Sequence, residues 1–287
     1  MKKIIREGIT EYGTPDMKYY AFDWDDNIVQ MPTKIILKDD NGDEVLIETD
    51  DFAKYRSLIG KENFEYNGST VVGFGEDPFK NFSVKGDKQF IVDCMLAKPG
   101  PAWDDFMECV NGGSVFAIIT ARGHNPNVMK EAVYNYIVSG WNGISSNELV
   151  KNLKKYRKFI GETDNERTNK MTLIKGYLDL CKFYPVSYMN EEGAKNPEEA
   201  KVKSMKEYRR YILELAQEIG KKGAEFIVKM TGKSPIDFKL PKPTIGFSDD
   251  DPKNVEVMKK RIGSEEGDDD IPVNIYSTHG GKKIRVK

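Results

Sequence analysis

The sequence predicts an α/β protein built on a doubly wound, Rossmann-like, mostly parallel sheet, and two observations support this fold class. Apolar runs of strand length alternate along the chain with segments whose apolar residues recur at helical spacing. At least three of the apolar runs end in polar residues, namely Asp23 and Asp25, Thr120, and Asp249 and Asp250. Because the carboxyl ends of parallel strands share one edge of a sheet, these residues would meet in a single ligand-binding crevice.

The composition is that of a globular protein with a substantial core. The 287 residues are 39% hydrophobic and 31% charged, and the net charge of −2 gives no support for a general polyanion-binding surface. Cys94, Cys109 and Cys181 form no CxxC pair, which argues against a disulfide framework and a thiolate metal site and favours a reduced, cytoplasmic setting. The sequence shows no signal peptide and no membrane-spanning run, so no membrane partner is expected.

The first strand is predicted at residues 20–22, directly before the acidic run 23–26. Asp23 and Asp25 would share one face of an ideal strand, which directs Trp24 to the opposite face and predicts a packing role for it. Two β-rich runs then flank Asn41-Gly42, a dipeptide that favours a tight hairpin turn. A short helix capped by Thr49 or Asp50 and ending at Gly60 is expected next.

After a boundary at the Pro-Gly-Pro run 99–101, strands and helices alternate more regularly. The apolar run 115–120 has the pattern of a strand buried on both faces of a parallel sheet. The lysine-rich residues 141–166 are interpreted as an excursion from the core. The expected elements are a helix over 103–110, a strand over 115–120, a helix from Pro126 to Gly140, a helix over 171–181, a strand over 185–189, a helix from Asn196 to Gly220, a strand over 244–247, a helix from Asp251 or Pro252, and a strand over 273–276.

The polar groups at the strand ends suit phosphoryl transfer. Several carboxylates in one crevice repel one another, and oxygen ligands without His or Cys favour Mg²⁺ as the compensating cation. A hydroxyl at Thr120, backbone N–H groups at Ala121 and Arg122, and a lysine would suit a phosphoryl group. One carboxylate can attack phosphorus, and a second one two residues later can shuttle the proton.

Three motifs resemble those of the haloacid dehalogenase-like superfamily of phosphohydrolases. They are DWDDNIV, VFAIITARG and IGFSDDDPKNV, each at the end of an apolar strand and in the family's order. They cover the core and leave roughly half of the chain as insertions. The resemblance implies that Asp23 is the nucleophile and Asp25 the general acid/base. It further implies that Thr120 binds the phosphoryl oxygens.

The same resemblance implies a Mg²⁺ site and a lysine. Asp249 and Asp250 would hold the ion together with Asp23 and the backbone carbonyl of Asp25, although Asp251 leaves the register within the acidic triplet open. The preferred lysine is Lys201, which would contact both the catalytic carboxylates and the substrate. The alternatives are Lys203, Lys239 and Lys242.

Other polar residues near these motifs have alternative interpretations. Arg122 is either a phosphate clamp or the partner of a neighbouring acid. His124 either touches substrate or has no role in the site, and His279 is expected to have none. Asp26, where the family often has glycine, has no assigned role.

Inserts after the first motif act as caps in this superfamily, so the resemblance implies a core of residues 1–29 and 99–287 and an inserted cap of mixed α/β structure over residues 30–98. The alternative is that residues 30–98 only extend the core. A cap that excludes water and bulky molecules favours a small phosphomonoester as substrate. A polynucleotide end phosphatase is a second hypothesis, based on the basic stretches 151–158 and 221–242. A protein that keeps this fold without turnover is a third. The sequence does not indicate an oligomeric state.

Overall fold

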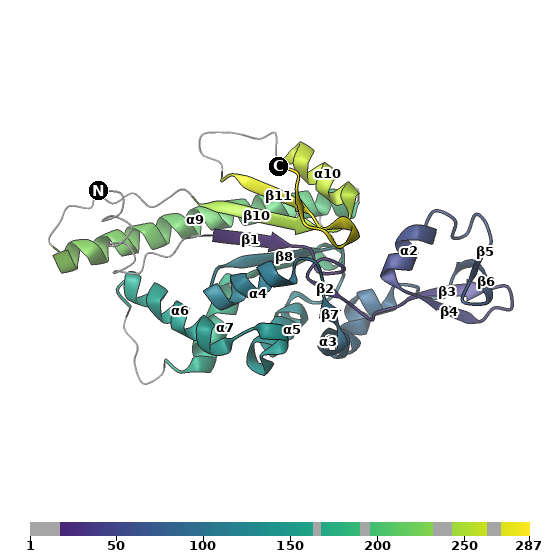
Figure 1. Ribbon diagram of the computed structural model, residues 1–287, viewed down its shortest axis with the longest axis horizontal. Helices are drawn as coiled ribbons and strands as arrows, with labels where there is room; N and C mark the ends of the chain where they lie inside the picture. The colour runs from purple at the N-terminus through teal and green to yellow at the C-terminus, as the bar shows by residue number, and fades with distance from the viewer. Residues whose placement is uncertain (1–17, 163–167, 190–195, 232–242, 263–270) are drawn as a thin grey trace.

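The computed structural model describes residues 18–162, 168–189, 196–231, 243–262 and 271–287 (Figure 1). Its central strands are β1 (Lys18–Phe22), β8 (Phe116–Thr120), β9 (Lys182–Pro185), β10 (Thr244–Asp249), β11 (Val273–Ser277) and β12 (Ile284–Arg285). They form one sheet in the order β12-β11-β10-β1-β8-β9, in which only the β11–β12 pair is antiparallel. The predicted α/β class with a mostly parallel sheet is therefore confirmed.

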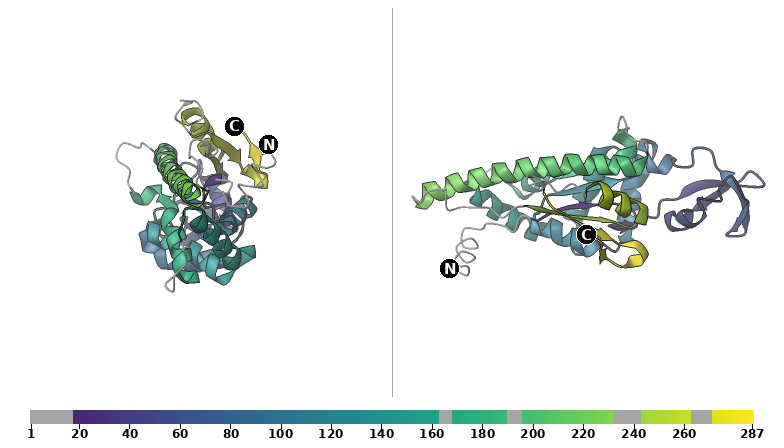
Figure 2. Two further views of the ribbon diagram at one scale, coloured as in Figure 1. Left: turned by 90° about the vertical axis from the view of Figure 1, so that its left-hand side faces the viewer. Right: turned by 90° about the horizontal axis from the view of Figure 1, so that it is seen from above.

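Helices cover both faces of this sheet (Figure 2). One side carries α4 (Trp103–Gly112), α5 (Pro126–Ser139), α6 (Ser146–Phe159) and α7 (Lys170–Leu180), and the other carries α9 (Pro197–Thr231) and α10 (Pro252–Arg261). Asn125 caps α5 ahead of Pro126, and Asp251 caps α10 through a hydrogen bond from the Lys253 N–H. In the described ranges, none of the helices combines the length and the apolar character needed to cross a membrane.

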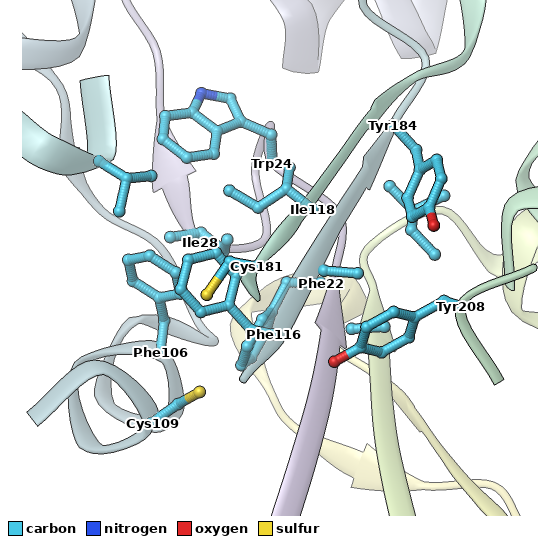
Figure 3. Close-up of a cluster of buried hydrophobic side chains, with 14 of the residues drawn as sticks. Phe22, Trp24, Ile28, Phe106, Cys109, Phe116, Ile118, Cys181, Tyr184 and Tyr208 are labelled. Atoms are coloured by element: carbon cyan, nitrogen blue, oxygen red, sulfur yellow. The ribbon is translucent and has the colours of Figure 1, made fainter. Parts of the chain in front are cut away.

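Aromatic and aliphatic side chains pack between the sheet and both helical layers. On one face, the ring of Phe106 in α4 meets Phe22 and Phe116 edge-on at centroid distances of 5.6 and 5.3 Å. On the opposite face, the side chain of Tyr208 in α9 is buried (Figure 3). Its hydroxyl donates a hydrogen bond to the Val115 carbonyl at 3.0 Å. All residues of β8 are buried, as its continuous apolar sequence predicts. This packing fixes the carboxyl ends of β1, β8 and β10 relative to one another.

The insertion between β1 and α4 contains a separate lobe that projects from one end of the molecule (Figures 1 and 2). Its elements are β3 (Ile35–Asp39), β4 (Glu44–Ile47), α2 (Thr49–Tyr55), β5 (Phe64–Tyr66) and β6 (Ser69–Phe74). The strands form an antiparallel sheet in the order β4-β3-β6-β5, whose apolar face, which includes Leu37, Val45 and Val71, packs against α2. Gly42 adopts a φ of +88° between β3 and β4, which confirms the hairpin at Asn41-Gly42.

The remaining insertion residues return the chain to the core. The 3₁₀ turns Lys80–Phe82 and Val84–Gly86 lead into α3 (Asp87–Leu96), whose Phe90 and Cys94 belong to the main hydrophobic core. The antiparallel pair of β2 (Val29–Gln30) and β7 (Lys98–Pro99) joins the two ends of the insertion. Within residues 30–98, the part with its own apolar core is therefore confined to the segment before α3.

Several local predictions are wrong, and packing explains most of the differences. The strand expected over 185–189 is instead β9 (Lys182–Pro185), and α8 (Val186–Met189) follows it. The helix expected to end at Gly220 continues to Thr231. Glycine inside a helix lowers its stability, but here the Phe159 ring packs directly against Gly223, where a Cβ would lie 2.3 Å from the ring. This packing compensates for the weak helix propensity of glycine. Residues 141–162 of the predicted excursion are not simply an excursion, because α6 packs against α4 and α7, while residues 163–166 lie outside the described residues. The short helix α2 is preceded by Glu48 and ends at Tyr55 rather than Gly60.

Candidate functional site

The polar residues at the ends of three neighbouring strands lie together at the carboxyl edge of the sheet. β1 pairs with β10 on one side and with β8 on the other, so Asp23, which follows β1, lies between the ends of the other two strands. The Asp23 N–H donates to the Ser248 carbonyl at 2.9 Å, which continues the pairing of β1 with β10 into the site. Thr120 is buried as the last residue of β8, and its Oγ1 accepts the Arg122 N–H at 3.3 Å.

The centre of the site is a cluster of three carboxylates and one lysine. Oxygens from Asp23, Asp249 and Asp250 lie within 4.8 Å of one another. Lys201, from the first turns of α9, reaches in and places its Nζ 3.1 Å from Asp23 Oδ2 and 2.8 Å from Asp249 Oδ2. Both ion pairs are buried, with Lys201 only 1% exposed. Among the alternative lysines, Lys203 is exposed on α9, whereas Lys239 and Lys242 lie outside the described residues.

Fully ionised, the three carboxylates would carry more negative charge than Lys201 can neutralise. Burial, reinforced by the nearby Asp249 and Asp25 against the opposing effect of Lys201, raises the pKa of Asp23. Burial and the carboxylates of Asp23 and Asp249 likewise raise the pKa of Asp250. The Asp23 and Asp249 carboxylates hold the pKa of Lys201 above its ordinary value, although burial opposes them. The lysine is therefore charged, and ionisation of all three carboxyl groups at once requires a further positive charge.

These residues fit a hard divalent cation. The donors are carboxylate oxygens, and Asp23 Oδ1 is buried without a hydrogen-bond partner among the described residues. Such an oxygen is costly to bury unless a ligand satisfies it. Oxygen donors with no nearby thiolate or imidazole favour Mg²⁺ over transition metals. The donor set and the unsatisfied oxygen are thus compatible with the Mg²⁺ site predicted from the sequence, which remains a proposal.

The raised pKa values of Asp23 and Asp250 predict that the stabilising effect of Mg²⁺ depends on pH. Without metal, the folded protein keeps protons on Asp23 and Asp250 up to pKa values of about 7 and about 9, whereas the unfolded chain loses them near pH 4. The folded state then binds more protons, so the free energy of unfolding should fall as pH rises through this window. Mg²⁺ binds the ionised carboxylates and should raise the melting temperature more at about pH 8.5 than at about pH 6. Thermal melts at both pH values, with and without Mg²⁺, measure the change in melting temperature. A change that is the same at both pH values and the same in Asp250→Asn would contradict the prediction.

Asn27 joins three segments beneath the acidic cluster. Its fully buried side-chain amide donates to the Asp23 carbonyl at 3.0 Å and to the Ser248 carbonyl and hydroxyl at 3.1 and 3.0 Å. Its Oδ1 accepts the Thr278 hydroxyl at 2.7 Å, and the Thr278 N–H donates to the Asp249 carbonyl at 3.1 Å. The backbones that carry Asp23 and Asp249 are therefore held by one polar network.

Asn27→Ala should lower the free energy of unfolding by about 2 to 4 kcal/mol, because it leaves the Thr278 hydroxyl and the Ser248 groups buried without their partner. Urea denaturation measures the change. The control is Asn147→Ala on the exposed start of α6, which should change stability by less than about 0.5 kcal/mol. Equal changes in the free energy of unfolding for the two variants would show that the Asn27 network stabilises the fold no more than an exposed asparagine does.

Asp25 lies beside the cluster and is paired with Arg122. The guanidinium donates from Nε to Oδ2 at 2.7 Å and from Nη2 to Oδ1 at 2.6 Å, which is a bidentate ion pair. Of the two alternatives from the sequence, the structure therefore shows the pair with a neighbouring acid. The Arg122 side chain is 1% exposed, so its guanidinium is not open to solvent as a free phosphate clamp.

The other candidate residues are distributed around this centre. Ala121 is exposed at the strand end, and its carbonyl accepts the Ser187 hydroxyl at 2.6 Å. His124 is buried; its Nε2 lies 3.1 Å from Arg122 Nη1 and its Nδ1 lies 3.0 Å from Asp87. Burial and the charge of Arg122 lower the pKa of His124, so the ring is neutral, with Nδ1 donating and Nε2 accepting. The ring is buried and contacts Arg122 and Asp87, so it supports the orientation of Arg122.

Trp24 and the residues that flank the cluster complete the description. Trp24 is fully buried and stacks on Tyr136 at 6.1 Å, in the packing role expected of it. Asp26 adopts a φ of +52°, within the turn that closes through its N–H to the Val29 carbonyl. Asp251 is the N-cap of α10, which leaves Asp249 and Asp250 as the acids of the triplet that join the cluster. His279 is exposed in a 3₁₀ turn after β11.

Sequence reasoning missed Thr33, Asp87, Asp93 and Thr278, which support the site through Arg122, His124 and Asn27. These residues lie in the insertion and near the C-terminus, far from the motifs they serve. In the sequence, each of them is simply a polar residue beside an apolar run, a pattern that is also common among surface residues. Such partners become visible only when the chain is folded.

Comparisons with known proteins yielded no match at any level. No family model matches the chain, and no curated protein or solved structure is similar enough to be significant. The residues of the site and their geometry therefore carry the functional conclusion.

Proposed function

We propose that this protein is a Mg²⁺-dependent phosphatase of the haloacid dehalogenase-like type, which hydrolyses a phosphomonoester through an aspartyl-phosphate intermediate. One observation carries the proposal: Asp23 lies at the sheet edge with Lys201, Asp249 and Asp250, while Asp25, two residues later, is held apart from them by Arg122. Two carboxylates in such different surroundings are suited to different chemical roles.

The first half of the reaction follows from these positions. The Thr120 hydroxyl, the backbone N–H of Ala121 and the Lys201 ammonium would bind and orient the phosphoryl oxygens. An Asp23 carboxylate oxygen attacks phosphorus, and the bond from phosphorus to the ester oxygen breaks. Asp25 must be protonated in the enzyme–substrate complex, and it then donates this proton to the leaving oxygen, so the alcohol departs neutral. Asp23 is then esterified to the phosphoryl group.

The second half regenerates the enzyme. Asp25, now ionised, takes a proton from a water molecule as that water attacks the phosphorus atom of the acyl phosphate. The bond between phosphorus and the Asp23 oxygen breaks, and inorganic phosphate leaves. Asp23, Asp249, Asp250 and the backbone carbonyl of Asp25 would hold Mg²⁺, which neutralises charge that develops on the phosphoryl oxygens.

The test is hydrolysis of a broad phosphomonoester panel by the wild-type protein with and without Mg²⁺. The panel contains sugar phosphates, nucleotides, an aryl phosphate and oligonucleotides that end in a phosphate. Release of phosphate that depends on Mg²⁺ is expected for small monoesters. Preference for the oligonucleotides would favour a polynucleotide end phosphatase, and hydrolysis of no member of the panel would favour a protein that keeps the fold without turnover.

A further inference from the structure

Arg122 is held by more contacts than its ion pair with Asp25 requires. Besides its two hydrogen bonds to Asp25, the guanidinium donates from Nη2 to the Thr33 hydroxyl at 3.2 Å and from Nη1 to His124 at 3.1 Å. Its Cζ lies 4.6 Å from the centre of the Phe82 ring and 5.2 Å from that of Phe90. A planar cation between aromatic rings and fixed acceptors is locked in one orientation.

Most of the groups that hold Arg122 come from the insertion between β1 and α4. Thr33 lies where the chain enters the lobe, and its hydroxyl donates to Asp93 of α3 at 2.6 Å. Phe82 lies where the chain leaves the lobe and packs against the lobe's own apolar core. The Phe82 carbonyl also accepts the Gly123 N–H at 2.7 Å, which ties this segment to the loop after β8. Residues of the insertion and the Asp25 carboxylate therefore contact the same group, the Arg122 guanidinium.

We propose that Arg122 is the positioning residue of Asp25, and that the insertion holds it in place through Thr33 and Phe82. This inference rests on the proposed function, because it assigns Arg122 to the proton-transfer step. A bidentate pair fixes the plane of the Asp25 carboxyl, so that it cannot turn toward Asp23 and Asp250. Each oxygen keeps a second lone pair, which can carry the proton for the leaving group. Residues of the insertion thereby help to position a catalytic side chain of the core.

The dependence of the rate on the leaving group tests this role. An alkyl phosphate needs a proton on its departing oxygen, whereas a nitrophenyl phosphate departs readily without one. The parameter to compare is kcat/KM, because it reports only the steps up to and including the first irreversible one, which is departure of the alcohol. It therefore excludes the later step in which Asp25 activates water. Arg122→Lys keeps the charge but loses the bidentate geometry. It should lower kcat/KM for the alkyl ester about 10²-fold and for the aryl ester less than about 5-fold.

Two further variants keep the test valid if Arg122→Lys folds poorly. Thr33→Val removes the hydroxyl that joins Arg122 to Asp93, and Phe82→Leu removes the ring beneath the guanidinium. Both should show the same pattern as Arg122→Lys with smaller losses. The matched control is Phe79→Leu, since Phe79 is the half-exposed neighbour of Phe82, with its ring 6.3 Å away. It should leave both esters unaffected.

The possible outcomes separate this inference from the proposed function. A selective loss on the alkyl ester in the Arg122, Thr33 and Phe82 variants supports the positioning role. Equal losses on both esters, with the wild type active and Asp23→Asn inactive, would overturn the positioning role and leave the phosphatase intact. A wild-type protein that hydrolyses neither ester would overturn the proposed function and this inference with it.

Discussion

Asp23→Asn should abolish hydrolysis of phosphate esters, with a loss of at least about 10³-fold in kcat. The amide has nearly the shape of the carboxylate but cannot form the acyl phosphate. The substitution also removes one charge from a cluster in which burial and neighbouring acids raise the pKa of Asp23. The variant should therefore fold, and its loss of activity would report chemistry rather than instability. Steady-state kinetics and a thermal melt on the same sample measure both effects.

The matched control is Asp26→Asn, the same chemical change three residues later. Asp26 lies in a turn with positive φ, which asparagine also tolerates, and it is outside the proposed catalytic group. Its kcat should stay within about 3-fold of the wild type. Comparable activity of Asp23→Asn and the wild type would remove Asp23 from the mechanism.

Lys201→Met should both destabilise the protein and inactivate it. The buried ammonium is the partner of Asp23 and Asp249, and its removal leaves two carboxylates in the interior without a cation. Breaking a buried ion pair from one side costs about 3 to 5 kcal/mol of the free energy of unfolding. The loss of a charged group that would contact the phosphoryl oxygens should lower kcat about 10²-fold or more.

Lys203→Met is the control on the same helix. Lys203 is exposed two residues further along α9, so the same substitution there should change stability by less than about 0.5 kcal/mol. Urea denaturation and kinetics of both variants make the comparison. Added Mg²⁺ should recover part of the stability of Lys201→Met, because it supplies positive charge to the same carboxylates. Equal effects of the two substitutions would contradict the buried role of Lys201.

Local sequence patterns predicted the parts of the fold that short-range physics determines. The apolar runs ending at Phe22 and Thr120, the hairpin at Asn41-Gly42 and the proline-initiated helix at Pro126 all form as expected. Each depends on residues within one strand or one turn. The sequence also indicated that the strand ends would meet, because parallel strands share a carboxyl edge.

Elements that depend on tertiary contacts could not be predicted in this way. The continuation of α9 past Gly220 depends on packing, because Gly223 lies where the Phe159 ring leaves no room for a Cβ. The acceptor of the Arg122 guanidinium was an open choice, since nothing near Arg122 in the sequence identifies Asp25, 97 positions earlier, as its partner. The same holds for Thr278 and Asn27, which are 251 positions apart.

The most direct test of the proposed mechanism is chemical trapping of the intermediate. The wild-type protein is mixed with Mg²⁺ and an aryl phosphate, quenched rapidly with acid, and treated with borohydride, which reduces an acyl phosphate to an alcohol but leaves free carboxylates unchanged. Peptide mass spectrometry then locates the reduced side chain. The mechanism predicts reduction at Asp23 that depends on substrate and is absent in Asp23→Asn. Reduction at another residue, or none at Asp23 during active turnover, would contradict the assignment of Asp23 as the nucleophile.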